Sequence, residues 1–216
     1  MKSLCFSGCS ITWGDELKNR YGERYSTIVS NHYNVKHVNI SECALSNDGI
    51  VRNTIRHLQN TSPDLVVIQY TVHPRLEYFT LKDEAEKWTP QRANTTSSNS
   101  RAYYLNVYND VMAAENMWKN IFLFDAYCKS VGQKYVSLIA DHFERIIVKP
   151  EKFYKDHIGY WRSMCKDYNP TYIQKDLLGT EFQRPENYAQ GVKGGHPSAS
   201  GHILMANKTI ELIDAI

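Results

Sequence analysis

The chain has 216 residues, which is the length of one α/β domain and too short for two well-separated domains. Hydrophobic residues make up 42% and charged residues 22%, so the chain can bury a core and is not disordered. The 25 Lys and Arg residues nearly balance the 23 Asp and Glu residues, and this net charge of +2 argues against a nucleic-acid or membrane partner.

The first half of the chain alternates strand and helix patterns. The N-terminal residues carry one charge and a short apolar run that ends in Gly8, which predicts a strand at 4–6 and not a signal peptide. Residues 35–40 predict a second strand, and residues 48–58 predict a helix because aliphatic residues recur there at spacings of three and four. The run at 65–70 is continuously apolar and β-branched, which is typical of a strand covered on both faces.

The second half continues this alternation with two irregular stretches. Residues 88–101 contain a polar run of low structural propensity and predict a surface loop. Residues 103–131 predict a long amphipathic helix, and residues 135–140 predict the next strand. A loop-rich insertion is expected around 150–192, before a last helix that begins near Ser200.

Strands that alternate with helices predict a parallel sheet covered on both faces, in a single domain over residues 1–216. No apolar run approaches the roughly 18–20 residues that a membrane-spanning helix needs. The five cysteines have scattered spacing, which favours reduced thiols over a disulfide framework. The sequence therefore predicts a cytoplasmic protein.

The first candidate for chemistry is the segment GCSITWGD at residues 8–15, directly after the first strand. Ser10 would lie at the carboxyl end of a parallel strand, where open α/β sheets place their active sites. The alternative is a plain strand-to-helix turn in which Ser10 caps the helix. The Gly-x-Ser-x-Gly elbow of α/β-hydrolases is absent, because Thr12 stands where the second glycine would be.

The second candidate is the segment GGHPSASGH at residues 194–202, directly before the last helix. His196 precedes a proline on a glycine-rich loop and is a candidate general base. His202 falls at the start of the helix and is better suited to orient its surroundings than to react.

Together the two segments resemble the end blocks of the SGNH (GDSL-type) hydrolases, which read Gly-Asp-Ser-x-Thr-x-Gly and Asp-x-x-His-Pro. Residues 39–47, NISECALSN, resemble the family's Asn…Gly segment, and residues 69–72, QYTV, fall where Gly-x-Asn-Asp usually stands. Arg75 and Glu77 resemble an Arg-x-Glu of some phage-encoded relatives. The resemblance is to a divergent, phage-like or marine-microbe-like member.

This resemblance implies a three-layer α/β/α sandwich with a flavodoxin-like parallel sheet of about five strands. It also implies acyl transfer, in which Ser10 attacks an ester carbonyl and His196 takes the serine proton and later gives it to the leaving alcohol. The implied oxyanion donors are the backbone N–H groups of Ser10 and Ala44 and the side chain of Thr71. Three further residues are candidates for support of this site: Asn47, Arg75 and His202.

Several positions depart from the family pattern. Cys9 replaces the aspartate of the first block, and Thr71 replaces an asparagine with a shorter donor. Ala44 replaces a glycine, and it can serve as a donor provided that the backbone needs no positive φ there. The most serious departure is Lys193, which stands where the family places its acid, three residues before His196.

Without a carboxylate, the imidazole of His196 loses the partner that fixes its tautomer, a loss of roughly four decades in rate in serine proteases. A backbone carbonyl, Asp141 or Glu186 could replace the acid, and the spacing does not choose among them. The sequence therefore predicts a Ser-His dyad.

The first functional hypothesis is a serine esterase or deacylase that acts on a small-molecule or saccharide ester, such as an acetylated sugar. No cofactor is expected, and no metal, because the histidine spacing matches no zinc pattern. The alternative is a catalytically degenerate module that binds carbohydrate or has a structural role. Aromatic residues in the insertion could line a sugar-binding cleft, although packing is the favoured interpretation. The sequence gives no indication of the oligomeric state.

Overall fold

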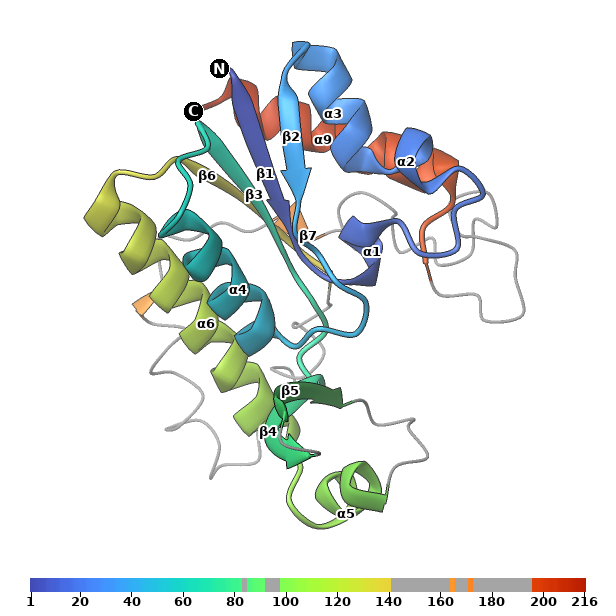
Figure 1. Cartoon of the computed structure of the whole chain (residues 1–216), viewed down its shortest axis with the longest axis vertical. Helices are drawn as coiled ribbons and strands as arrows, with labels where there is room; N and C mark the ends of the chain where they lie inside the picture. Colours follow the sequence, from blue (N-terminus) through green and yellow to red (C-terminus); the bar gives the residue numbers. More distant parts are fainter. Residues whose placement is uncertain (83–84, 92–97, 141–163, 166–170, 173–195) are drawn as a thin grey trace.

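The structure of the protein is a computed structural model that describes residues 1–82, 85–91, 98–140, 164–165, 171–172 and 196–216. The fold is built on a five-stranded sheet (Figure 1). All four pairings in this sheet are parallel, and the strand order is β2-β1-β3-β6-β7. The strands are β1 (Ser3–Ser7), β2 (Lys36–Asn39), β3 (Leu65–Tyr70), β6 (Tyr135–Ile139) and β7 (Thr171–Tyr172).

Counted along the chain within this sheet, the strand order is 2-1-3-4-5, the flavodoxin-like order. The order reverses between β1 and β3, and in open α/β sheets the ligand-binding crevice lies at such a reversal, beyond the carboxyl ends of the two strands. All six residues of β3 are buried, as the continuous apolar run predicts. The predicted flavodoxin-like sheet of about five strands is confirmed.

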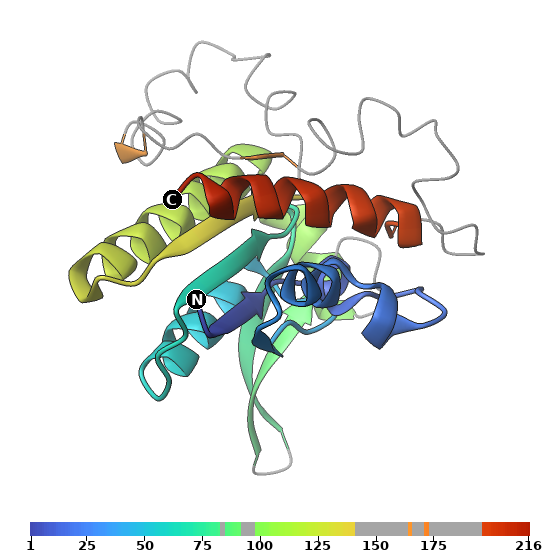
Figure 2. The ribbon, with the colours of Figure 1, turned by 90° about the horizontal axis from the view of Figure 1, so that it is seen from above.

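Helices cover both faces of the sheet and complete three layers (Figures 1 and 2). On one face, α4 (Asn47–Leu58) and α6 (Asp110–Val131) pack through Ile50, Met117 and Phe124. On the other face lie α3 (Tyr25–Tyr33) and α9 (Ala199–Asp214), which contribute the buried residues Tyr25, Val29, Met205 and Ala206. The predicted α/β/α sandwich is therefore confirmed.

Polar side chains fix where the main helices begin. The Ser46 hydroxyl accepts a hydrogen bond from the Gly49 N–H at the start of α4, and the Ser198 hydroxyl accepts one from the Gly201 N–H at the start of α9. The Asn109 side chain accepts from two N–H groups at the start of α6. The single helix predicted over 103–131 is wrong, because this cap separates α6 from the shorter α5 (Ser98–Asn106).

A second, two-stranded antiparallel sheet follows β3 along the chain. It consists of β4 (Leu76–Lys82) and β5 (Ala85–Gln91), and its register places Phe79 opposite Trp88, with ring centroids 5.3 Å apart. Such aromatic cross-strand pairs stabilise hairpins. The loop predicted over 88–101 is therefore wrong at both ends, because its first residues belong to β5 and its last residues belong to α5. Residues 92–97, in the middle of the predicted loop, fall outside the described residues.

The insertion expected around 150–192 falls almost entirely outside the described residues, apart from 164–165 and 171–172. The assignment of the whole chain to a single domain therefore stays a prediction.

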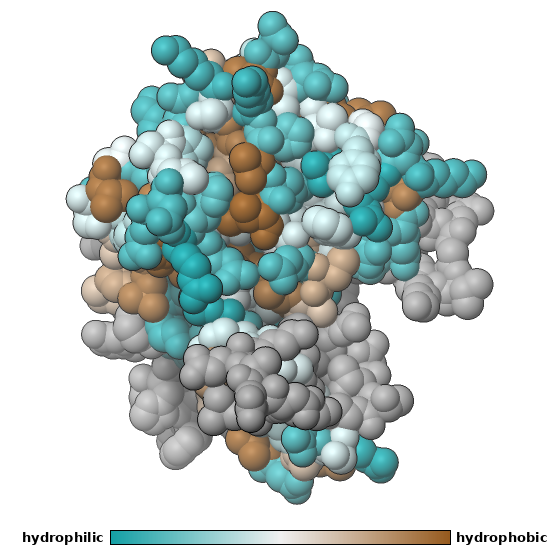
Figure 3. Space-filling model, in the orientation of Figure 1, coloured by the Kyte–Doolittle hydropathy of each residue, from teal (hydrophilic) through white to brown (hydrophobic). Residues whose placement is uncertain are grey.

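Within the described part of the chain, no helix combines the length and apolarity needed to cross a bilayer. The face in Figure 3 is mostly hydrophilic, with apolar side chains gathered near the edge strand β2, where Val38 is exposed. All five cysteines are free thiols.

Candidate active site

Ser10 lies where the crevice opens, immediately beyond the carboxyl end of β1. It is the first residue of the short helix α1 (Ser10–Trp13), and Cys9 is the N-cap, so the alternative in which Ser10 caps the helix is wrong. The Ser10 N–H has no partner within the helix, since the first N–H groups of any helix lack one. A Cβ atom on Gly8 would meet the Thr12 hydroxyl at 2.3 Å, so the tight turn before Ser10 requires glycine.

Buried polar side chains tie the Ser10 turn to the neighbouring strands. Gln69, fully buried in β3, accepts hydrogen bonds from the Thr12 hydroxyl at 3.0 Å and from the Cys9 thiol at 3.4 Å. Asn39, at the end of β2, donates to the Thr12 carbonyl at 2.9 Å. A buried, fully bonded network of this kind holds a turn in one conformation.

His196 approaches Ser10 from the other end of the chain. Its Nε2 atom lies 2.9 Å from the Ser10 Oγ atom, although 186 residues separate the two in sequence. His196 stands two residues before Ser198, whose cap begins α9, so the start of this helix fixes the place of the imidazole. A hydroxyl within hydrogen-bond reach of an imidazole is the arrangement of an activated nucleophile and its base.

The second imidazole nitrogen faces a carboxylate. His196 Nδ1 lies 3.3 Å from Glu16 Oε1, while Asp15 Oδ2 lies 3.9 Å from Nε2. The sequence did not single out Glu16, since the acids considered were the family position at Lys193 and the substitutes Asp141 and Glu186. All three of these residues fall outside the described residues.

The loop between β2 and α4 carries the second expected oxyanion donor, Ala44. Its φ is 71°, so the backbone does need the positive φ that favours glycine, and alanine occupies the position at a cost in conformational energy without losing its N–H. An L-residue in this conformation costs about 1–2 kcal/mol relative to the right-handed one. The Glu42 N–H donates to the Gly8 carbonyl at 3.3 Å and so ties this loop to the Ser10 turn.

Thr71, the third expected donor, follows β3 and is buried. Its N–H donates to Asn47 Oδ1 at 2.8 Å, and its carbonyl accepts from Asn47 Nδ2 at 3.2 Å. The backbone N–H of Thr71 is therefore already engaged, which leaves the side chain as the donor that the resemblance implies. The two bonds from Asn47 hold the Thr71 backbone in place.

The two charged residues after β3, Arg75 and Glu77, have different surroundings. The Glu77 side chain is buried and pairs with Arg52 of α4, not with Arg75. The Arg52 guanidinium also lies over the Trp88 ring, 4.3 Å from its centroid.

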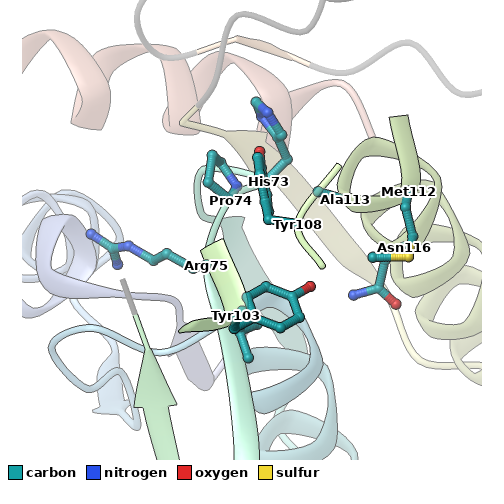
Figure 4. A pocket seen from close by; sticks show the side chains of 9 residues that line it. His73, Pro74, Arg75, Tyr103, Tyr108, Met112, Ala113 and Asn116 are labelled. Atoms are coloured by element: carbon teal, nitrogen blue, oxygen red, sulfur yellow. The ribbon is translucent and has the colours of Figure 1, made fainter. Parts of the chain in front are cut away.

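Arg75 lies at the rim of a cavity of about 230 Å³ between the loop after β3 and the start of α6. Figure 4 shows its guanidinium extending away from Tyr103 and Tyr108, which line the same cavity. Arg75 Nη1 is buried and has no hydrogen-bond partner among the described residues.

His202 is part of the core and not of the crevice. It is fully buried in α9, and its Nδ1 accepts from the Tyr25 N–H at 3.2 Å, which satisfies the first N–H of α3. Burial, helped by the nearby His196, lowers the pKa of His202 to about 4. The imidazole is therefore neutral at pH 7 and joins two helices.

The Ser10 hydroxyl thus faces an imidazole, and a carboxylate faces the other nitrogen of that imidazole. A set of this kind can transfer a proton, which is one of the requirements of acyl transfer. In the described part of the chain, no three His, Cys, Asp or Glu side chains cluster as a metal site would require.

Comparison with solved structures identifies the fold. The chain aligns with a lipolytic protein of the G-D-S-L family from Desulfitobacterium hafniense DCB-2 over 98% of its own length and 99% of the other, with TM-score 0.59 and 11% identity. A member of the lipolytic G-D-S-L family from Veillonella parvula DSM 2008 aligns over 100% of both chains, with TM-score 0.56 and 16% identity. A catalytic mutant of an acetylxylan esterase from Geobacillus stearothermophilus covers 98% of this chain and 94% of its own, with TM-score 0.59 and 12% identity.

No protein-family model matches the chain, and no curated protein matches its sequence. The structural likeness nevertheless covers whole chains and includes several independent lipolytic proteins and esterases. The protein has the SGNH-type hydrolase fold, a fold that ester hydrolases use.

Proposed function

We propose that the protein is a serine esterase or deacylase of SGNH type, with Ser10 as the nucleophile and His196 as the general base. The observation that carries the proposal is the 2.9 Å distance between Ser10 Oγ and His196 Nε2. The acetylxylan esterase with this fold is described in two catalytic mutants, one with a serine and one with a histidine replaced by alanine. Both residue types stand at the crevice of this chain.

In the proposed reaction, Ser10 Oγ bonds to the ester carbonyl carbon while its proton passes to His196 Nε2. The carbonyl oxygen becomes an oxyanion, held by the N–H groups of Ser10 and Ala44 and by the Thr71 hydroxyl. The intermediate collapses as the carbon–oxygen bond to the alcohol breaks, and the imidazolium protonates the departing oxygen. Water then repeats the sequence on the acyl-enzyme, releasing the carboxylic acid and restoring Ser10.

The proposed substrate is an O-acyl ester of a small molecule or a saccharide, with acetyl as the simplest acyl group. One of the proteins with this fold is described both as an acetylxylan esterase and as an acetyl-xylooligosaccharide esterase, which supports the choice of an acetylated sugar for the first assays. The mechanism needs no cofactor, because all proton transfers run between the side chains and the substrate.

Hydrolysis of p-nitrophenyl acetate and of peracetylated xylose by the purified protein tests the proposal. Ser10→Ala should abolish turnover. Ser30→Ala is a matched control, since Ser30 is also a buried serine but donates within α3 to the Ser26 carbonyl, away from the crevice. Unchanged hydrolysis in Ser10→Ala would overturn the proposal. An inert wild-type protein whose saccharide binding survives both Ser10→Ala and His196→Ala would instead favour the binding module.

A further inference from the structure

We propose that Glu16 is the residue that orients His196, so that the site is a Ser10-His196-Glu16 triad whose acid comes from the same turn as its nucleophile. The inference rests on the proposed function and deepens it. It replaces the expected dyad with a triad in which the acid lies six residues after the serine, and not three residues before the histidine.

The two imidazole nitrogens of His196 face different partners. Nε2 lies 2.9 Å from Ser10 Oγ, and Nδ1 lies 3.3 Å from Glu16 Oε1. A carboxylate at Nδ1 keeps the proton on that nitrogen and leaves the lone pair of Nε2 free to take the serine proton. It also stabilises the imidazolium that forms during the reaction.

Burial argues that these two groups serve each other. Glu16 Oε2 and His196 Nδ1 are both buried, and neither has a hydrogen-bond partner among the described residues. The Glu16 side chain is 20% exposed as a whole, but leaving its buried Oε2 atom without a partner is costly, and the Oε1 atom of the same carboxylate lies 3.3 Å from the imidazole nitrogen. Catalytic hydrogen bonds are often long in free enzymes and shorten when substrate binds, so a small rotation of either group would complete this one.

The backbone turns the Glu16 side chain toward His196 at a cost. Glu16 has a φ of 68°, in the left-handed region, and stands two residues after Gly14, the C-cap of α1, whose φ is 83°. The Asp15 N–H donates to the Ser10 carbonyl at 2.9 Å, which closes the turn and fixes its direction. Strained non-glycine residues of this kind concentrate at functional sites, where the strain holds a side chain in a required place.

Asp15 is the neighbouring carboxylate and does not fit this role. Its Oδ2 atom lies 3.9 Å from His196 Nε2, the nitrogen that faces Ser10 and not the one that must keep its proton. Its side chain is 38% exposed, against 20% for Glu16, so water screens its charge more strongly. Asp15→Asn removes the same charge one residue away and is the matched control.

The test compares Glu16→Gln, Glu16→Gly and Asp15→Asn with the wild-type enzyme in p-nitrophenyl acetate hydrolysis. Glu16→Gln should lower kcat by roughly 10²- to 10⁴-fold with little change in KM, because an amide can stabilise the wrong imidazole tautomer. Glu16→Gly relieves the left-handed backbone, so it should fold at least as stably and yet lose activity to a similar extent. Asp15→Asn should stay within about threefold of wild type.

Proton NMR supplies a readout that a merely structural residue would not move. A downfield Nδ1–H resonance should be present in the wild-type protein and in Asp15→Asn, and absent in both Glu16→Gln and His196→Ala. A Glu16→Gln enzyme within threefold of wild-type kcat, with the resonance retained, would overturn the triad while leaving the esterase proposal intact. Failure of the esterase proposal is distinguishable, since the wild-type protein would then show no Ser10-dependent turnover.

Discussion

His202 makes the stability of this protein depend on pH in a way that can be calculated. Burial lowers its pKa from 6.5 to about 4 in the folded protein, whereas the unfolded chain keeps the ordinary value. Between these two pH values the unfolded state binds more protons than the folded state. The free energy of unfolding therefore falls as the pH drops from 6.5 towards 4, and it is largely unaffected by this group above pH 7.

The size of the effect follows from the two pKa values. A difference of one unit corresponds to 1.36 kcal/mol, so the full shift from 6.5 to about 4 limits the loss to roughly 3 kcal/mol. Between pH 7 and pH 4.5, the linkage relation gives about 2.5 kcal/mol of this loss. That is a large share of the 5–15 kcal/mol by which native domains are typically stable.

The perturbation that isolates His202 is His202→Asn, because the Asn Oδ1 atom can take the place of the imidazole Nδ1 and accept from the Tyr25 N–H. The variant is less stable at neutral pH through the lost ring contacts, including the stacking on Tyr25 at a centroid distance of 6.0 Å. Urea unfolding at pH 7 and pH 4.5 should show a loss about 2.5 kcal/mol larger in the wild-type protein than in the variant. Equal losses in the two proteins would refute the reasoning.

Three substitutions test the loops around the crevice. Ala44→Gly should raise the free energy of unfolding by about 0.5–1 kcal/mol and keep esterase activity, because relief of the positive φ outweighs the added entropy of the unfolded chain. Urea unfolding measures this difference, and a loss of stability would contradict the prediction. Asn47→Ala leaves the buried N–H and C=O of Thr71 unpaired and should cost about 2–4 kcal/mol with a lower kcat, whereas Asn47→Asp keeps the acceptor and should cost less. Gly8→Ala places a Cβ against Thr12, so thermal unfolding should show a lower Tm, and an unchanged Tm would contradict the tight turn.

The sequence was sufficient for the elements that carry strong local signals. The buried run of β3 and the periodicity of α4 are strong local signals, and both elements lie within two residues of their predicted bounds. Ser10 and His196 could be singled out because each stands in a short motif beside a predictable strand or helix. Their contact across 186 residues then follows from the order of the strands, which brings the end of β1 and the start of α9 to the same edge.

Glu16 could not be found in this way, because its contribution depends on a backbone conformation that the residue type disfavours. A glutamate after Gly14-Asp15 indicates an exposed polar turn, and only the left-handed φ at this position turns the side chain inward. Ala44 is the same case, since alanine gives no sign of the positive φ that it adopts.

The β4–β5 hairpin and the division between α5 and α6 were missed for a different reason. The hairpin depends on the pairing of Phe79 with Trp88 across strands, which a local pattern does not register. The helical pattern over 103–131 continues through the break between α5 and α6. The Asn109 side chain nevertheless starts a new helix there, because it caps the first N–H groups of α6.

Labelling with a fluorophosphonate, followed by intact-mass measurement and peptide mapping, tests the central claim most directly because it needs no knowledge of the substrate. The account predicts one covalent adduct on Ser10 in the wild-type protein, no adduct in Ser10→Ala, and labelling at least about 100-fold slower in His196→Ala, because removal of the base from a serine-protease triad lowers kcat by about 10⁶-fold. A wild-type protein that stays unlabelled under conditions that modify an active serine esterase would contradict it.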